Sequence, residues 1–259
     1  MTLPLVILSV LSVASPGASQ TTSGPPAGKA AADPSSAQAS RLLARARAAH
    51  GGAAVLAIRD FTFSGEMTMA TPQGEMTFAS EGAFTVSGKS RMVMKMPVGE
   101  IVQVFDGSAL WTRTMQGVQQ MPPAMAAQAR SARERDLFSV LRNFDRPGYA
   151  AAVLPPGSHS VEGKTIDSVR ISRDGVGPFV TLLLDRATGL AAGKVYAGQA
   201  MIGQPGDMLE VFADLREIGG VRIPFRTVIS SNGRRTAEQR LKEFKINPGV
   251  DDSVFQRPQ

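Results

Sequence analysis

The chain of 259 residues contains no cysteine. This absence excludes disulfide bonds, a zinc site built from thiolates and a cysteine nucleophile. It also excludes an acylated cysteine at the start of a mature exported chain, so the protein is not expected to be a lipoprotein itself. A chain without thiols fits the cell envelope, although many cytosolic proteins lack cysteine too.

Histidine is nearly as scarce, since the chain has only His50 and His159. His50 precedes a pair of glycines that ends a predicted helix, and His159 follows Pro155-Pro156-Gly157-Ser158, so both are interpreted as capping or solvated residues. No Ser-His-Asp set, no spacing of metal ligands and no glycine-rich phosphate loop stands out. We therefore expect no catalytic residue, no metal and no cofactor, and a protein that is not an enzyme.

Acidic residues are fewer than basic ones, and the formal net charge is +6. The basic residues are scattered, with short clusters at Arg41–Arg47, Arg130–Arg135 and Arg234–Arg240. Aromatic residues make up only 6% and are not interleaved with the basic clusters, as a platform for stacking bases would need. We expect a basic solvated surface and no nucleic-acid partner.

Long apolar runs are absent after the first twenty residues. Leu3 to Val13 has the length of the apolar part of a signal peptide and is too short to cross a bilayer. Small residues follow, and cleavage after Ser19 would place Gly17 and Ser19 at the required small positions. Residues 20–38 are mostly Ser, Thr, Gly, Pro and Ala, which is typical of a disordered linker. We expect a signal peptide over 1–19 and a periplasmic or secreted protein.

Most of the remaining chain alternates between apolar and polar residues, which is the period of a half-buried β-strand. Helical spacing is confined to Ser40–His50, a short turn after it, and a long stretch from Pro122 to about Phe144. One antiparallel sheet of about eleven strands must curl or close to protect its edges, so we expect a single mainly β domain. The predicted strands are Phe61–Met69, Met76–Val86, Met92–Met96, Ile101–Phe105, Leu110–Met115, Ile166–Ile171, Phe179–Leu184, Gly193–Tyr196, Met208–Leu215, Val221–Ile229 and Arg240–Ile246.

Methionine is the strongest local signal, because nine of the twelve methionines lie between Met67 and Met125. Alternation places the methionines of each of three neighbouring strands on one face. Their flexible side chains suit a surface that fits varied apolar ligands, whereas the alternative is an ordinary packed core. The long helix would cover this face as a lid or pack on it permanently, and Trp111 would lie at the cavity mouth or in the core. The residues expected to line the cavity are Met67, Met69, Met76, Phe78, Met92, Met94, Met96, Trp111, Met125, Leu137 and Leu141.

Several short motifs, in this order and spacing, resemble the LolA/LolB-like superfamily of outer-membrane lipoprotein-sorting proteins and periplasmic lipid carriers. The motifs are Ala49-His50-Gly51-Gly52, Phe105-Asp106-Gly107 before Trp111, Val161-Glu162-Gly163-Lys164, Leu184 to Leu190, Gly219 to Phe225, and Val250 to Phe255. The resemblance implies a strongly curved, unclosed antiparallel β-barrel with helices lidding an apolar cavity, here a lipid-binding domain over residues 39–259. It supplies no catalytic motif and no single binding residue.

Three functions from different classes remain open at this point. The first is a periplasmic carrier or chaperone for acyl chains of lipids or lipoproteins, with a part in outer-membrane lipoprotein sorting. The second is a non-catalytic envelope sensor or adaptor that recognises a protein or a lipid. The third is a small hydrolase on a curved β scaffold. We expect a monomer whose partners are acyl chains and, as a further candidate, an envelope membrane protein.

Overall fold

The computed structural model describes residues 34–97, 99–199 and 205–259. The predicted signal peptide and the linker up to residue 33 lie outside the described residues. Helix α1 (Pro34–Ala49) already begins at residue 34, so the prediction that 34–38 belongs to the linker is wrong. A proline at the first helical position favours this start, and Ala39 is fully buried beside Leu43. Residues 34–38 have the composition of a linker, but they form a helical turn because tertiary packing stabilises the helix that they begin.

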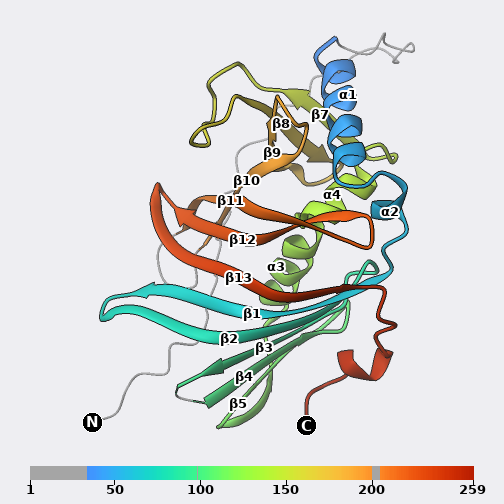
Figure 1. Ribbon diagram of the computed structural model, residues 1–259. Helices are drawn as coiled ribbons and strands as arrows, with labels where there is room; N and C mark the ends of the chain where they lie inside the picture. Colours follow the sequence, from blue (N-terminus) through green and yellow to red (C-terminus); the bar gives the residue numbers. More distant parts are fainter. Residues whose placement is uncertain (1–33, 98, 200–204) are drawn as a thin grey trace, which may run out of the picture.

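The strands form one antiparallel sheet whose spatial order is β6-β5-β4-β3-β2-β1-β13-β12-β11-β10-β9-β8-β7. The chain builds one half from β1 to β6 and the other from β7 to β13, and the halves meet where Phe61 pairs with Ile246. The edges β6 and β7 do not pair with each other, so the mainly β, unclosed and curved barrel that we predicted is confirmed (Figure 1). The strands are β1 (Asp60–Thr71), β2 (Gly74–Thr85), β3 (Ser90–Met96), β4 (Gly99–Phe105), β5 (Leu110–Thr114), β6 (Gly117–Gln120), β7 (Tyr149–Val153), β8 (Ile166–Arg173), β9 (Gly177–Asp185), β10 (Ala191–Gln199), β11 (Pro205–Ile218), β12 (Val221–Ser231) and β13 (Arg234–Ile246).

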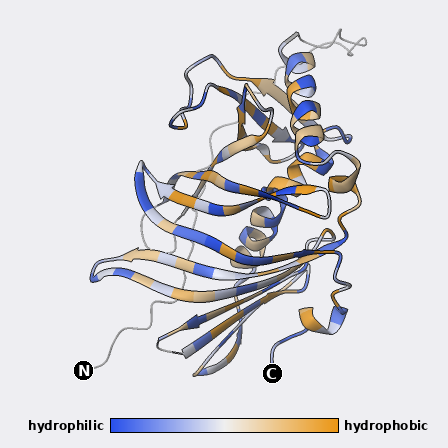
Figure 2. Cartoon of the chain, in the orientation of Figure 1, coloured by the Kyte–Doolittle hydropathy of each residue, from blue (hydrophilic) through white to orange (hydrophobic). Residues whose placement is uncertain are grey.

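Thirteen strands replace the predicted eleven, because the two edge strands were missed. β6 is only four residues long, and β7 contains three alanines, so neither shows the alternation that marks a strand. Figure 2 shows this alternation of hydrophobic and hydrophilic residues along the longer strands.

The long predicted helix is in fact two helices, α3 (Pro123–Glu134) and α4 (Leu137–Asn143). Asp136 lies between them, and its side chain accepts a hydrogen bond from the backbone N–H of Phe138, which caps α4. The remaining helices are α2 (Ala53–Leu56) and the C-terminal 3₁₀ turn η1 (Asp252–Phe255). No helix of the described part is both long and apolar enough to span a bilayer.

The main core lies between one face of the sheet and the helices α1 and α4. Leu43 and Leu141 are fully buried there, and burying one such side chain contributes about 2 kcal/mol. The ring of Phe61 stacks on Phe84 and Phe244, with centroid distances of 5.0 and 5.2 Å. α4 is fixed further because the Arg47 guanidinium donates to the Leu141 carbonyl oxygen at 2.6 Å. The helices α1 and α4 are therefore part of the core.

The junction between α1 and α2 is fastened to the sheet by His50. This side chain is fully buried, so its interpretation as a capping or solvated residue is wrong. Its Nδ1 donates to the Arg222 carbonyl oxygen at 2.9 Å, and its Nε2 accepts from the Ala191 N–H at 3.0 Å. Next to it, a Cβ on Gly51 would lie 2.2 Å from the Gly220 carbonyl oxygen. Only glycine fits this approach, which explains the glycine after the histidine.

Candidate functional site: the concave face of the sheet

Most of the predicted methionines gather on the face of the sheet that carries the helices, here called the concave face. Met67 pairs with Phe78 and Met69 with Met76 across β1 and β2, and Met94 faces Ser80 across β2 and β3. By alternation these side chains share the face of Phe61 and Phe84. We call this cluster the methionine surface; it comprises Met67, Met69, Met76, Phe78, Met94 and Met96, with Ile101 and Ala237 beside them.

The methionine surface is separate from the main core. All its members belong to the strands β1, β2, β3, β4 and β13, and no residue of a described helix is part of the cluster. Met69, Phe78 and Met94 are buried, and Met67, Met76 and Met96 are partly exposed. Next to this surface, the rings of Phe63 and Phe84 lie over Gly82, where a Cβ would be 2.5 Å from either ring.

Helix α3 lies over the concave face and contacts the strands β4 and β5. Its buried residues, Met125 and Ala126, pack on Phe105 and Leu110 of β4 and β5. Its C-terminal turn places Arg133 with Cζ 4.2 Å from the centroid of the Phe84 ring. The helix thus covers the inner part of the concave face and ends beside the aromatic residues.

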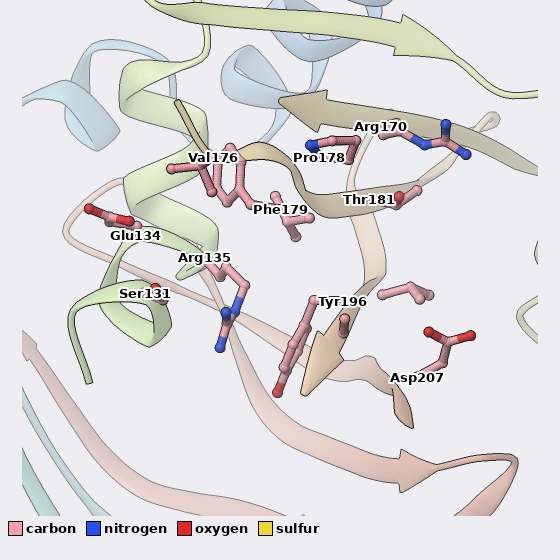
Figure 3. A pocket seen from close by; sticks show the side chains of 13 residues that line it. Ser131, Glu134, Arg135, Arg170, Val176, Pro178, Phe179, Thr181, Tyr196 and Asp207 are labelled. Carbon is pink, nitrogen blue, oxygen red and sulfur yellow. The ribbon is translucent and has the colours of Figure 1, made fainter. Parts of the chain in front are cut away.

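A pocket lies between the C-terminal end of α3 and the strands β9 and β10, at the point where these two strands separate (Figure 3). Pairing between these strands ends at Thr181 and Val195, although both strands continue. The resulting cavity has a volume of about 360 Å³, within the range of pockets for small ligands. Its walls combine the apolar residues Val176, Pro178 and Phe179 with Arg135 and Tyr196.

The polar wall of this pocket is an ordered network. Arg135, the residue that directly follows α3, lies over the Tyr196 ring, with Cζ 4.6 Å from the centroid. The Tyr196 hydroxyl donates to Glu210 at 2.8 Å, and Lys194 Nζ lies 3.3 Å from the same carboxylate. Burial, followed by the nearby Glu210 carboxylate, raises the pKa of Tyr196 well above its usual range, so the phenol stays protonated and donates.

The described residues contain no group of three or more acidic or histidine side chains that could hold a metal ion. The arrangement is suited to binding, because the concave face is apolar, α3 lies over part of it, and cationic side chains lie at the end of α3.

The architecture resembles several solved structures at low sequence identity. A DUF1329 family protein from Desulfovibrio piger superposes with a TM-score of 0.59 at 11% identity, covering 86% of this chain and 97% of that chain. A putative outer membrane lipoprotein-sorting protein domain from Vibrio parahaemolyticus and a LolA superfamily protein from Nitrosomonas europaea each give a TM-score of 0.55 at 13% identity, covering 84% of this chain and 97% of theirs. The chain has a LolA-like fold. Neither models of protein families nor curated proteins match the sequence.

The LolA-like fold that the sequence motifs implied is thus confirmed, and the predicted residues can be placed on it. Six of them form the methionine surface, as expected. Met92 lies on the same face but packs against the main core, and Met125 belongs to α3 and packs on Phe105 and Leu110. Leu137 and Leu141 are buried in the main core on α4, so the prediction that they line an open cavity is wrong.

Trp111 lies on the opposite, convex face of the LolA-like sheet. It pairs with Val104 and packs in a cluster with Phe255 of η1, and Arg257 Cζ is 5.2 Å from its ring centroid. The expectation of a place at the cavity mouth is therefore wrong. Its neighbour Leu110 is the residue of this strand that faces α3.

Sequence reasoning missed the arginines of α3 and the pocket. Arg133 and Arg135 were interpreted as part of a solvated basic surface, but both guanidinium groups lie against aromatic rings. Their position was the available signal, because both arginines lie within the stretch from Pro122 to Phe144 that was expected to form the helix covering the methionines.

Proposed function

We propose that the protein is an exported carrier that holds acyl chains of lipids or lipoproteins on its concave face, without catalysis. The single observation that supports this most is the methionine surface, an apolar cluster outside the main core to which no described helix contributes. The likeness in fold to a lipoprotein-sorting domain and to a LolA superfamily protein agrees with a carrier.

Methionine is suited to this task because its unbranched thioether side chain adapts to ligands of different shape. Each methylene group moved from water to such a surface contributes about 0.8 kcal/mol, so about ten methylenes would contribute at most about 8 kcal/mol before the cost of association. A ligand made of acyl chains therefore gains enough from burial alone to bind a surface without many polar contacts.

In this proposal α3 is the lid, and α4 is not. α4 is held by Asp136, by Arg47 and by complete burial of Leu141. α3 is held on the sheet through Met125 and Ala126, by the hydrogen bond from Arg130 to the Gly107 carbonyl oxygen and by the ion pair of Glu134 with Arg173. These contacts would have to break for α3 to move without α4.

Uptake of a fluorescent fatty-acyl probe by natively purified protein tests the carrier function, and displacement by unlabelled lipid shows a shared site. Since the chain has no cysteine, a single disulfide between Met125→Cys in α3 and Leu110→Cys in β5 can fasten the lid. We expect the oxidised variant to lose probe uptake and chemical reduction to restore it.

Equal uptake in both redox states would contradict a moving α3. A wild-type protein that takes up no probe, and that instead retains a stable protein partner in a pull-down, would contradict the carrier and favour an adaptor.

A further inference from the structure

Arg133 stands at the inner end of the apolar concave face. It belongs to the last turn of α3, and its side chain is 17% exposed. Its Cζ lies 4.2 Å from the Phe84 ring centroid and 5.8 Å from that of Phe61. These rings fix the plane of the guanidinium against the apolar floor.

The charge of Arg133 is poorly compensated. Its Nε is buried and has no hydrogen-bond partner in the part of the chain that the structure describes. The nearest carboxylate oxygen, on Asp136, is 3.9 Å from Nη2, and the other oxygen of Asp136 caps α4. By contrast, Arg173 meets Glu134 at 2.6 Å. Burial lowers the pKa of Arg133, which agrees with a cation that lacks a close anion.

A second polar group without a partner lies on the same face. Ser80 is 1% exposed, and its Oγ is buried without a hydrogen-bond partner among the described residues. Along β2 it lies between Phe84, beneath Arg133, and Phe78 of the methionine surface, and all three side chains point to one side. The polar groups thus lie along the line from the guanidinium to the methionines.

The length of this line is a little greater than the depth of one acyl chain in a bilayer. Phe84 and Phe78 are six residues apart on β2, which is about 20 Å along a strand. Half of the hydrocarbon thickness of a bilayer, the depth of one acyl chain, is about 15 Å. A chain with its head group at Arg133 would therefore extend to about Ser80, four residues from Phe84 or about 14 Å along the strand, where its end meets Met94 of the methionine surface.

We propose that Arg133 anchors the anionic head group, a carboxylate or a phosphate, of an acyl-chain ligand whose tail lies on the methionine surface. This inference rests on the proposed carrier function and names its ligand class, namely anionic amphiphiles in preference to neutral ones. A guanidinium binds both anions through paired N–H donors, so the two sources share one chemistry.

Displacement of a neutral apolar probe by matched ligands tests the inference. Oleate, its uncharged methyl ester and an oleoyl lysophosphatidic acid are titrated at about pH 8, where the carboxylate is ionised. We expect wild type to bind at least one of the two anions about tenfold or more tightly than the ester. The arm with the larger preference distinguishes carboxylate from phosphate.

Arg133→Met removes the charge while retaining an apolar stem, and it should bind acid and ester about equally, with ester affinity unchanged. Arg130→Met is the matched control on the same helix, because Arg130 is exposed and donates to the Gly107 carbonyl oxygen; it should keep the wild-type preference.

Equal affinity of the wild-type protein for the ester and both anions would overturn the inference. A preference for an anion over the ester that persists in Arg133→Met would overturn it as well. Binding of the ester with no anion preference leaves the carrier function standing. If neither the probe nor any of the three ligands binds the protein, both proposals are refuted.

Discussion

Val93 and Met94 are neighbours on β3 and provide a matched test of the two faces of the sheet. Each is 8% exposed. Val93 points to the convex face and packs in a cluster with Val102, Val104 and Phe255, whereas Met94 belongs to the methionine surface. If the methionine surface is a binding site, a carboxylate introduced at these two positions should have different consequences.

The expected magnitude at Val93 follows from the pKa of a buried carboxyl group. A glutamate in a dry interior has a pKa of about 8 to 9, against about 4.3 when it is solvated. At pH 7 the folded state must therefore keep it protonated, which costs about 1.36 kcal/mol for each unit between 4.3 and 7, or about 4 kcal/mol. This is a large share of the stability of an ordinary domain, which is about 5 to 15 kcal/mol. No residue of a described helix belongs to the cluster around Met94, so a smaller rearrangement brings water to a carboxylate there, and we expect a lower cost of about 1 to 3 kcal/mol.

Urea unfolding followed by circular dichroism measures both variants, and the fatty-acyl probe measures binding. Met94→Glu should stay folded and lose the probe, and Met94→Leu should keep both fold and probe because volume and polarity barely change. Val93→Glu should lose most of its stability at pH 7 and regain part of it near pH 4. Equal losses of stability in the two glutamate variants would show that Met94 lies in a dry core and not on a binding surface. A folded Met94→Glu that binds the probe normally would remove this surface as the site.

Two further predictions concern the junction that fastens α1 to the sheet. Gly51→Ala should lower the free energy of unfolding by about 2 kcal/mol or more, because its Cβ would lie 2.2 Å from a carbonyl oxygen at a φ of +122°. Gly74→Ala is the control, because its φ of +118° is similar and no described atom lies within 4 Å of the added Cβ; it should cost about 1 kcal/mol from backbone strain alone, and an equal or larger loss at Gly74 would count against the contact. Burial lowers the pKa of His50 in the folded protein below its usual value of 6.5. The stability that neutral His50 contributes is therefore complete above pH 6.5 and is lost as the pH falls through the lower pKa of the folded state. The thermal midpoint should drop on acidification below pH 6.5, and an equally steep drop in the variant His50→Gln would exclude His50 as the cause.

Local patterns were sufficient for most of the sheet. Alternation along β1 and β2, with a short turn between them, predicts a hairpin and puts Met67 and Met69 on one face. The break between α3 and α4 at Asp136 was not predicted, because helical spacing continues on either side of it. The methionine surface could thus be predicted because it depends only on period and hairpin pairing.

Features that depend on distant parts of the chain could not be predicted. Both faces of β5 are apolar at Leu110 and Trp111, and only the C-terminal turn with Phe255 decides which face Trp111 joins. His50 finds its partners at Arg222 and Ala191, far along the chain. The pocket beside Tyr196 exists because β9 and β10 separate, and no local pattern records that separation.

Mass spectrometry of an organic extract of natively purified protein tests the central claim most directly. We expect an acyl-chain lipid in an amount comparable to the protein, and its loss from the folded variant Met94→Glu. A folded wild-type protein without lipid, which also takes up none when mixed with vesicles, would contradict the claim that the methionine surface holds acyl chains.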